Sequence, residues 1–276
     1  RRSVRPTPGV AHPARPALLL DVGPTYPTPP GYSPTGAGGV PEFMTRLRTY
    51  LTRYVPLGHC APSLAAETAL GRACWVLNAW EGAYRAGGAL DMDFAAEDVT
   101  ELLNLAPAGV LTELLALITR AHTSGALAEL RALAGTPAPG RALGIAGPVF
   151  VPHWADGDLL IGDTLIDVKT VMHARGHDRT AGWLQQLLAY TWLDVADRYR
   201  IRRVGLYLAR HGRLITWPID TFTHTLLRTD DPDQIASTCA QFRDLAARVI
   251  RDEGADPRNL QPAHQPSGGS CDGSRT

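Results

Sequence analysis

Near Pro148 the spacing of apolar residues changes from a helical period to the period of strands. Between residues 41 and 134 apolar side chains recur every three or four positions, with Gly and Pro at the joints, which is typical of amphipathic helices. The stretch VFVPHWADGDLLIGDTLIDVKTV is instead rich in β-branched residues and holds a Gly-Asp turn signal. The change predicts helices that pack beside a sheet.

The rest of the chain extends this pattern. We expect a helix from about residue 180 to 197, then two strands joined by a His-Gly turn in RRVGLYLARHGRLITWPI. A closing helix with an Asp cap follows in DPDQIASTCAQFRDLAARVIRDE. The predicted fold class is α/β (α+β), with a mixed β-sheet flanked by helices and a helical N-terminal layer.

Both ends of the sequence differ from the middle in composition. Residues 1–40 are dense in Pro and Gly without periodic apolar spacing, and residues 253–276 have a similar composition. Such composition is typical of disordered segments. We therefore expect a disordered arm at 1–40, a single domain at 41–252 and a disordered tail at 253–276. Within the domain, a helical layer at 41–145 precedes a core at 146–252.

Bulk composition excludes several classes of protein. Formal net charge is zero, so attraction to nucleic acid must come from local clusters of charge. The four cysteines are scattered, which argues against zinc and iron–sulfur sites, and we expect reduced thiols with Cys74 in the core. No apolar run reaches the ~18 residues of a membrane span, so the sequence predicts a cytoplasmic protein without a membrane partner.

The positive charges are almost all arginine. Of the 27 Lys and Arg residues, Lys169 is the only lysine. We interpret this bias as arginine replacing lysine wherever a generic positive charge suffices. Lys169 is then expected at a position where arginine does not suffice.

The first hairpin places two acids opposite each other. If Gly162 and Asp163 form a two-residue turn, then Asp158 lies opposite Asp167 on the neighbouring strand. Like charges so placed, with Cβ atoms ~5 Å apart, are destabilising. Something must compensate them.

Alternation of side chains places Lys169 on the same face as Asp167, while Ile166 and Val168 point into the core. Two carboxylates and an ammonium at adjoining positions suit a hard divalent cation, Mg²⁺ or Mn²⁺, with water and a phosphate completing its shell. The alternative is a surface hairpin on which Lys169 merely bridges two acids. Asp156 would share a face with Asp158 and is the rival for the first acid.

The residues from 150 to 215 resemble the PD-(D/E)XK nuclease superfamily, and within it the RecB-like branch. DLLIGDTLIDVK is similar to the family's first acid, turn and D-x-K triplet, and QLLAY to the branch's Gln and Tyr four residues apart. The resemblance implies a restriction-endonuclease-like core with metal-dependent deoxyribonuclease activity. Asp158, Asp167 and Lys169 would be catalytic.

The resemblance also implies further roles. The backbone carbonyl of Val168 would bind the metal together with Asp158 and Asp167, and Gln186 with Tyr190 would line the site beside DNA. Positions four apart share a helix face, so both side chains can reach one site; the alternative is that they merely cap the sheet.

One motif departs from the pattern. The branch often carries a histidine or an acid in the first helix of the nuclease core, where GRACW has Trp75. That ligand is then missing, or it is supplied by Glu67 or Glu81.

Local basic segments suggest a nucleic-acid partner. Six arginines and no acid lie between residues 198 and 213, and further basic residues follow the D-x-K strand in the loop 172–179, which could close over a substrate strand. Local positive charge of this kind dominates phosphate binding, although a solvated strand edge would look the same. An RNA-directed nuclease with the same site and a non-catalytic nucleic-acid-binding subunit remain alternatives to a deoxyribonuclease.

Overall fold

The computed structural model describes most of the expected domain. The described residues are 39–86, 98–137, 140–152, 154–173, 176–253 and 257. The expected arm at 1–40 and tail at 253–276 therefore lie almost wholly outside the described residues. Within the described ranges, no helix is both long and apolar enough to cross a membrane.

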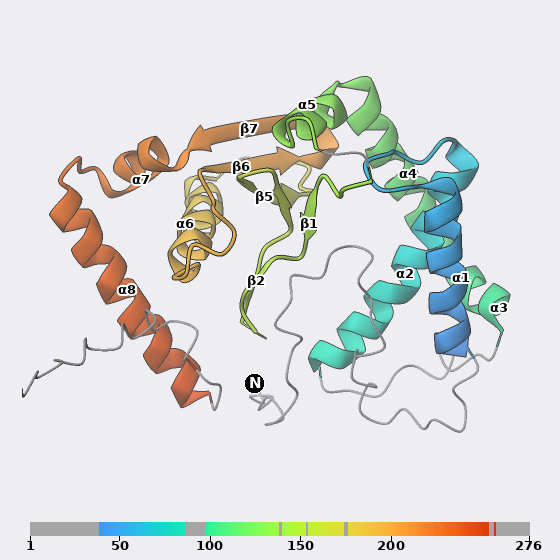
Figure 1. Ribbon diagram of the computed structural model, residues 1–276, viewed down its shortest axis with the longest axis horizontal. Coiled ribbons are helices and arrows are strands. Elements are labelled where there is room, and N and C mark those ends of the chain that lie inside the picture. Colours follow the sequence, from blue (N-terminus) through green and yellow to red (C-terminus); the bar gives the residue numbers. More distant parts are fainter. Residues whose placement is uncertain are drawn as a thin grey trace, which may run out of the picture.

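A five-stranded mixed sheet forms the centre of the fold (Figure 1). Only β5 and β6 are parallel, and the other neighbours are antiparallel. The remaining two strands, β2 and β3, form a separate small sheet. The strands of the main sheet, in spatial order, are β1 (Gly144–Ala146), β4 (Leu159–Ile161), β5 (Thr164–Lys169), β6 (Arg203–Leu208) and β7 (Arg213–Pro218). The small sheet pairs β2 (Val149–Val151) with β3 (Ala155–Asp156).

The hairpin of β4 and β5 has the predicted register. Leu159 pairs with Ile166 and Ile161 with Thr164, around a turn at Gly162 and Asp163. Gly162 has a φ of +58°, and a Cβ at this position would overlap the carbonyl oxygen of Leu133. Glycine here therefore permits both the turn and the close approach of the Leu133 carbonyl.

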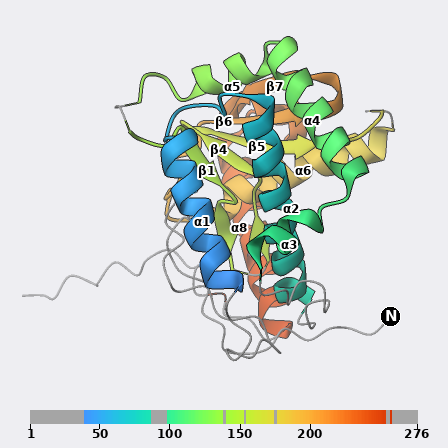
Figure 2. The same ribbon diagram turned by 90° about the vertical axis from the view of Figure 1, so that its right-hand side faces the viewer.

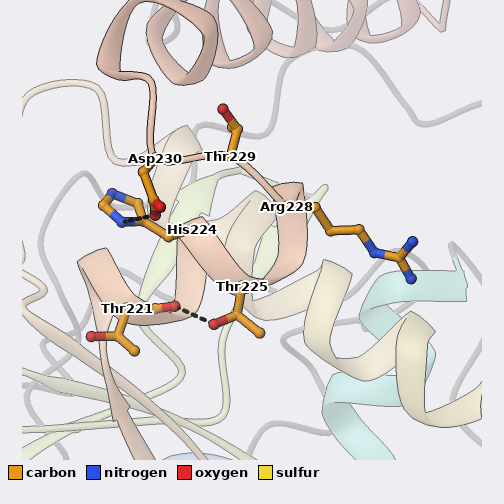
Figure 3. Close-up of a pocket in the computed structure, with 6 residues that line it drawn as sticks. All are labelled: Thr221, His224, Thr225, Arg228, Thr229 and Asp230. Atoms are coloured by element: carbon orange, nitrogen blue, oxygen red, sulfur yellow. Dashed lines mark hydrogen bonds and ion pairs between the residues drawn. The ribbon is translucent and has the colours of Figure 1, made fainter.

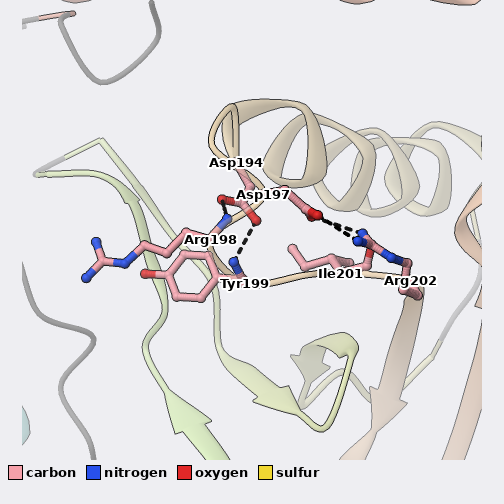
Figure 4. Close-up of polar contacts among 6 residues, drawn as sticks. All are labelled: Asp194, Asp197, Arg198, Tyr199, Ile201 and Arg202. Carbon is pink, nitrogen blue, oxygen red and sulfur yellow. Dashed lines mark hydrogen bonds and ion pairs between the residues drawn. The ribbon is translucent and has the colours of Figure 1, made fainter. Parts of the chain in front are cut away.

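Helix α6 (His177–Leu193) connects the two parallel strands, as a parallel pair requires. It ends four residues before the predicted end at 197, because the Asp194 carboxylate accepts hydrogen bonds from the backbone N–H groups of Arg198 (2.8 Å) and Tyr199 (2.9 Å) (Figure 4). These bonds fold residues 194–199 into a loop instead of a further helical turn.

Helices cover both faces of the sheet. On one face, α4 (Ala108–Thr123) and α5 (Ala126–Leu133) pack against Ile166 and Tyr207. On the other, α6, α7 (Ile219–Leu227) and α8 (Pro232–Asp252) pack against Leu165, Val204 and Leu206. The Asp231 carboxylate caps α8 at the N–H of Asp233, as predicted. The connection between β6 and β7 is a short 3-10 helix, η3 (Ala209–His211), followed by Gly212.

The N-terminal helices form a layer with its own core, to the right of the sheet in Figure 1 and in front of it in Figure 2. They are α1 (Gly39–Tyr54), α2 (Leu64–Ala86) and α3 (Val99–Asn104). Phe43, Val76, Trp80 and Leu102 are buried among them, and α2 joins them to α4. The expectation that Cys74 is a core residue is wrong: its side chain is exposed, because Ala73 and Val76 occupy the inward face of α2.

Candidate functional site

The five residues expected at the site lie on β5, on α6 and directly before β4. Asp158 lies directly before β4, Asp167 and Lys169 lie on β5, and Gln186 and Tyr190 lie on α6. Leu165, two positions before Asp167 in β5, packs in the core with residues of α6. Asp167 and Lys169 therefore face α6 at the end of the strand.

Asp167 is buried and paired with the lysine. Its side chain is 5% exposed and that of Lys169 is 18% exposed. The lysine Nζ donates to Oδ1 at 2.9 Å and lies 2.7 Å from Oδ2. Both carboxylate oxygens therefore lie within contact distance of the one ammonium, and Oδ2 is buried.

The Asp158 carboxylate lies beside Asp167. Its Oδ2 accepts the backbone N–H of Val168 at 2.6 Å, which attaches the acid to β5 where the β4 ladder has ended. Burial raises the pKa of Asp167, the nearby Lys169 opposes that rise, and the negative charge of Asp158 adds to it. The two acids therefore repel each other at close range, as their opposition across the hairpin predicted.

The alternative of a surface hairpin is wrong, because the face that carries Asp167 is covered by α6. An exposed ion pair contributes little to stability, whereas burial of the Asp167 carboxylate is costly unless its charge is compensated. Lys169 contacts this buried carboxylate, which agrees with the expectation that the chain's one lysine lies where arginine does not suffice.

Gln186 and Tyr190 extend the network from α6. Gln186 Oε1 lies 3.4 Å from Lys169 Nζ, and Gln186 Nε2 donates to the Tyr190 hydroxyl at 2.8 Å. The Tyr190 ring stacks on Phe150 with centroids 5.2 Å apart. Burial raises the pKa of Tyr190, against the effect of its bond to Gln186, and the charges of the nearby aspartates raise it further.

Sequence reasoning missed Trp183. Its ring lies under the Lys169 ammonium, 5.7 Å from Nζ to the centroid, within the range of a cation–π contact. The signal was present, because Trp183 precedes Gln186 by three positions and so shares its helix face.

Asp156 and Asp158 differ in what they contact. Asp156 lies in β3 opposite Val149, and its charge raises the pKa of Tyr190 and Tyr199, so it is near the tyrosine end of the network. Asp158 is the acid hydrogen-bonded to β5. Contact with β5 therefore favours Asp158 over its rival.

The structure does not bring the candidate helix ligands to the two aspartates. Glu67 lies 3.9 Å from His122 of α4, and Glu81 is exposed on α2. Trp75, also on α2, is partly exposed. Within the described ranges no three His, Cys, Asp or Glu side chains form a group that could hold a metal. The groups available to a metal ion are therefore the carboxylates of Asp158 and Asp167 and backbone atoms of β5. The Val168 side chain itself packs toward α4 and α5.

This set fits a hard divalent cation that keeps most of its shell as water and substrate oxygen. Mg²⁺ is usually bound by one or two carboxylates rather than by a closed protein cage. The carboxylates of Asp167 and Asp158 lie close together and supply the oxygen ligands that such an ion prefers.

The six arginines between residues 198 and 213 do not form one cluster, because β6 separates Arg210 and Arg213 from the other four. Arg202 precedes the strand and binds the Asp197 carboxylate at 2.6 and 2.9 Å (Figure 4). Arg210 and Arg213 follow the strand, at the end where Lys169 pairs with Leu208. Of the loop 172–179, residues 174 and 175 lie outside the described residues, and α6 begins at His177.

A separate pocket lies along α7 and the residues that follow it (Figure 3). His224 Nδ1 contacts the Asp230 carboxylate at 3.1 Å, and Thr225 donates to the backbone of Thr221. Thr229 donates to the Gln234 side chain, so the hydroxyl groups of Thr225 and Thr229 are both engaged away from the histidine.

Comparisons of the chain with protein-family models, curated proteins and solved structures found no significant match. Inference about function therefore depends on the geometry of the chain's own residues.

Proposed function

We propose that this chain is a metal-dependent deoxyribonuclease with a restriction-endonuclease-like core, and that Asp158 and Asp167 bind Mg²⁺ or Mn²⁺. The observation that carries the proposal is the buried carboxylate of Asp167, which lies against both the Asp158 carboxylate and the Lys169 ammonium. Lys169 can neutralise one of the two charges. A divalent cation would neutralise the rest and explain why both acids are present.

The order of elements supports the same proposal. The hairpin carrying Asp158 and Asp167 is followed by α6 with Gln186 and Tyr190, and then by the parallel strand β6. This is the order in which the resemblance to PD-(D/E)XK nucleases places its two motifs. A cytoplasmic location, with reduced cysteines, belongs to the proposal as well.

In the proposed reaction, water attacks the phosphorus and the P–O bond to the leaving oxygen breaks. The bound ion would supply Lewis acidity and a more acidic water. Lys169 donates from Nζ to a phosphate oxygen on which negative charge grows. Asp167 and Gln186 fix the position of that ammonium, and Tyr190 orients Gln186. A compact ammonium can approach the phosphate where the broad guanidinium of arginine would not fit.

Cleavage assays with matched variants test the proposal. Plasmid DNA, linear DNA and RNA of the same sequence are incubated with Mg²⁺ or Mn²⁺, with and without chelator. We expect the wild type to cut DNA only with metal, and Lys169→Ala and Asp167→Asn to lose most of the activity. Asp163→Asn is the control, because Asp163 is an exposed acid at the turn of the same hairpin.

The outcomes separate the alternatives. Equal cleavage by the wild type and Lys169→Ala would refute the proposed mechanism. Cleavage of RNA alone would replace DNA by RNA as the substrate of the same site. Metal-independent binding of DNA without any cleavage would favour a non-catalytic subunit. Conversion of plasmid to nicked or linear forms would identify an endonuclease.

A further inference from the structure

Lys169 belongs to a row of three residues that crosses the sheet beyond the described site. Lys169 of β5 pairs with Leu208 of β6, and Leu208 pairs with Arg213 of β7. Laterally paired residues point to the same face of a sheet, so all three side chains project from the face that carries Asp167. Two strand spacings of ~4.8 Å put the Cα atoms of Lys169 and Arg213 about 10 Å apart.

The packing confirms which face this is. Val168, Tyr207 and Leu214 belong to the cluster under α4 and α5, and each is the chain neighbour of a member of the row. Leu206, two positions before Leu208, packs in the core on the α6 side. Alternation then directs the row toward α6.

The part of this face over β7 is open next to the site. Arg213 is exposed, and Ile215, which points to the same face, is 41% exposed. Trp217, two positions further, is covered by Phe222 of α7, with ring centroids 5.6 Å apart. The uncovered strip of Arg213 and Ile215 therefore lies at the end of the strand that adjoins Lys169.

Arg213 is free to bind an anion, unlike its neighbours. Among the described residues Arg213 makes no ion pair, whereas Arg210 pairs with Glu113 of α4 and donates to the Thr170 carbonyl at 2.8 Å. Lys169 is itself held 2.7 Å from Asp167. Arg213 is thus an available positive charge on the site's face that can meet a second phosphate.

We propose that Arg213, with Ile215 beside it, is a binding subsite for a backbone phosphate next to the one that is cut, so that the substrate strand runs from Asp167 across Leu208 toward β7. The inference rests on the proposed nuclease function and adds the direction of the strand. A guanidinium suits this role because its planar fork can bind two phosphate oxygens at once.

The test measures binding without cleavage. A labelled single-stranded oligonucleotide and its duplex are titrated in chelator over a series of NaCl concentrations, with wild type, Arg213→Gln, Arg213→Lys and Arg202→Gln. We expect Arg213→Gln to bind several-fold more weakly, with a salt slope smaller by about 0.7 on the single strand or about 0.9 on the duplex. Arg213→Lys should keep most of the slope. Arg202→Gln is the matched control at the opposite end of β6, and should bind as the wild type does.

Unchanged slopes in Arg213→Gln, or an equal loss in Arg202→Gln, would overturn the subsite. In that case metal-dependent cleavage that is lost in Lys169→Ala would leave the proposed function in place. Conversely, a wild type that binds the oligonucleotide but never cleaves DNA would refute the nuclease proposal. The salt slopes of binding would still show whether Arg213 contacts a phosphate. Thermal unfolding of Arg213→Gln checks that its fold is retained, as expected for an exposed position on an edge strand.

Discussion

Removal of the Lys169 ammonium should destabilise the protein strongly in the absence of metal. In Lys169→Met the Asp167 carboxylate, 5% exposed, would stay buried beside Asp158 without its counter-ion. Loss of one partner of a buried ion pair costs about 3–5 kcal/mol. Because Lys169 is 18% exposed and Asp158 can reach solvent, we expect the lower end, about 3 kcal/mol.

Urea unfolding in chelator at neutral pH measures this change. With an m-value of about 2 kcal/mol/M, the midpoint should fall by roughly 1.5 M. The loss should shrink at acidic pH, where Asp167 is protonated and no buried charge remains. The double variant Asp167→Asn with Lys169→Met should recover much of the loss for the same reason.

Arg202→Met is the matched control, because Arg202 also binds an aspartate but both side chains of that pair are more than half exposed. Its loss should be much smaller than that of Lys169→Met, because water screens an exposed pair. The account of the site fails if Lys169→Met loses no more stability than Arg202→Met, or if the double variant is less stable than Lys169→Met alone.

Three further predictions concern the Asp167 carboxyl group, the Lys169 amine and the Gly162 backbone. The pKa of Asp167 is higher in the folded than in the unfolded chain. Protonated Asp167 therefore stabilises the fold at low pH, and this contribution is lost as pH rises through the folded pKa. The unfolding free energy of the wild type should accordingly fall relative to that of Asp167→Asn over that range. Acylation with a lysine-selective reagent should abolish cleavage by modifying Lys169, with peptide mapping to separate it from the α-amino group; full activity after complete modification would contradict its role. Gly162→Ala should lose more than about 1 kcal/mol in thermal unfolding, because of its positive φ and the nearby Leu133 carbonyl, whereas Gly109→Ala in α4 should lose nothing.

The local parts of the site could be predicted from the sequence. A two-residue turn at Gly162 and Asp163 fixes the register of β4 and β5, and the period of two then places Asp167 and Lys169 on one face. The spacing of Gln186 and Tyr190 likewise fixes a shared helix face, and they are hydrogen-bonded to each other. Such relations depend only on residues close in the chain.

Other features depended on segments far apart in the sequence. The arginines on either side of β6 look like one patch because they are neighbours in the chain, but the strand carries Arg202 and Arg213 to opposite ends of the sheet. The helix predicted to reach residue 197 ends at Leu193, because hydrogen bonds of the Asp194 carboxylate compete with helical ones. Propensity and periodicity describe neither effect.

The sequence by itself determined that two acids and the chain's one lysine would adjoin on a hairpin, because strand register and alternation are local properties. Only the tertiary structure decided that this face is buried, since α6 must cross over the sheet to join β5 to the parallel strand β6. Burial removes water from Asp167 and raises its pKa, and it turns an ordinary surface ion pair into a group of charges that a divalent cation can stabilise.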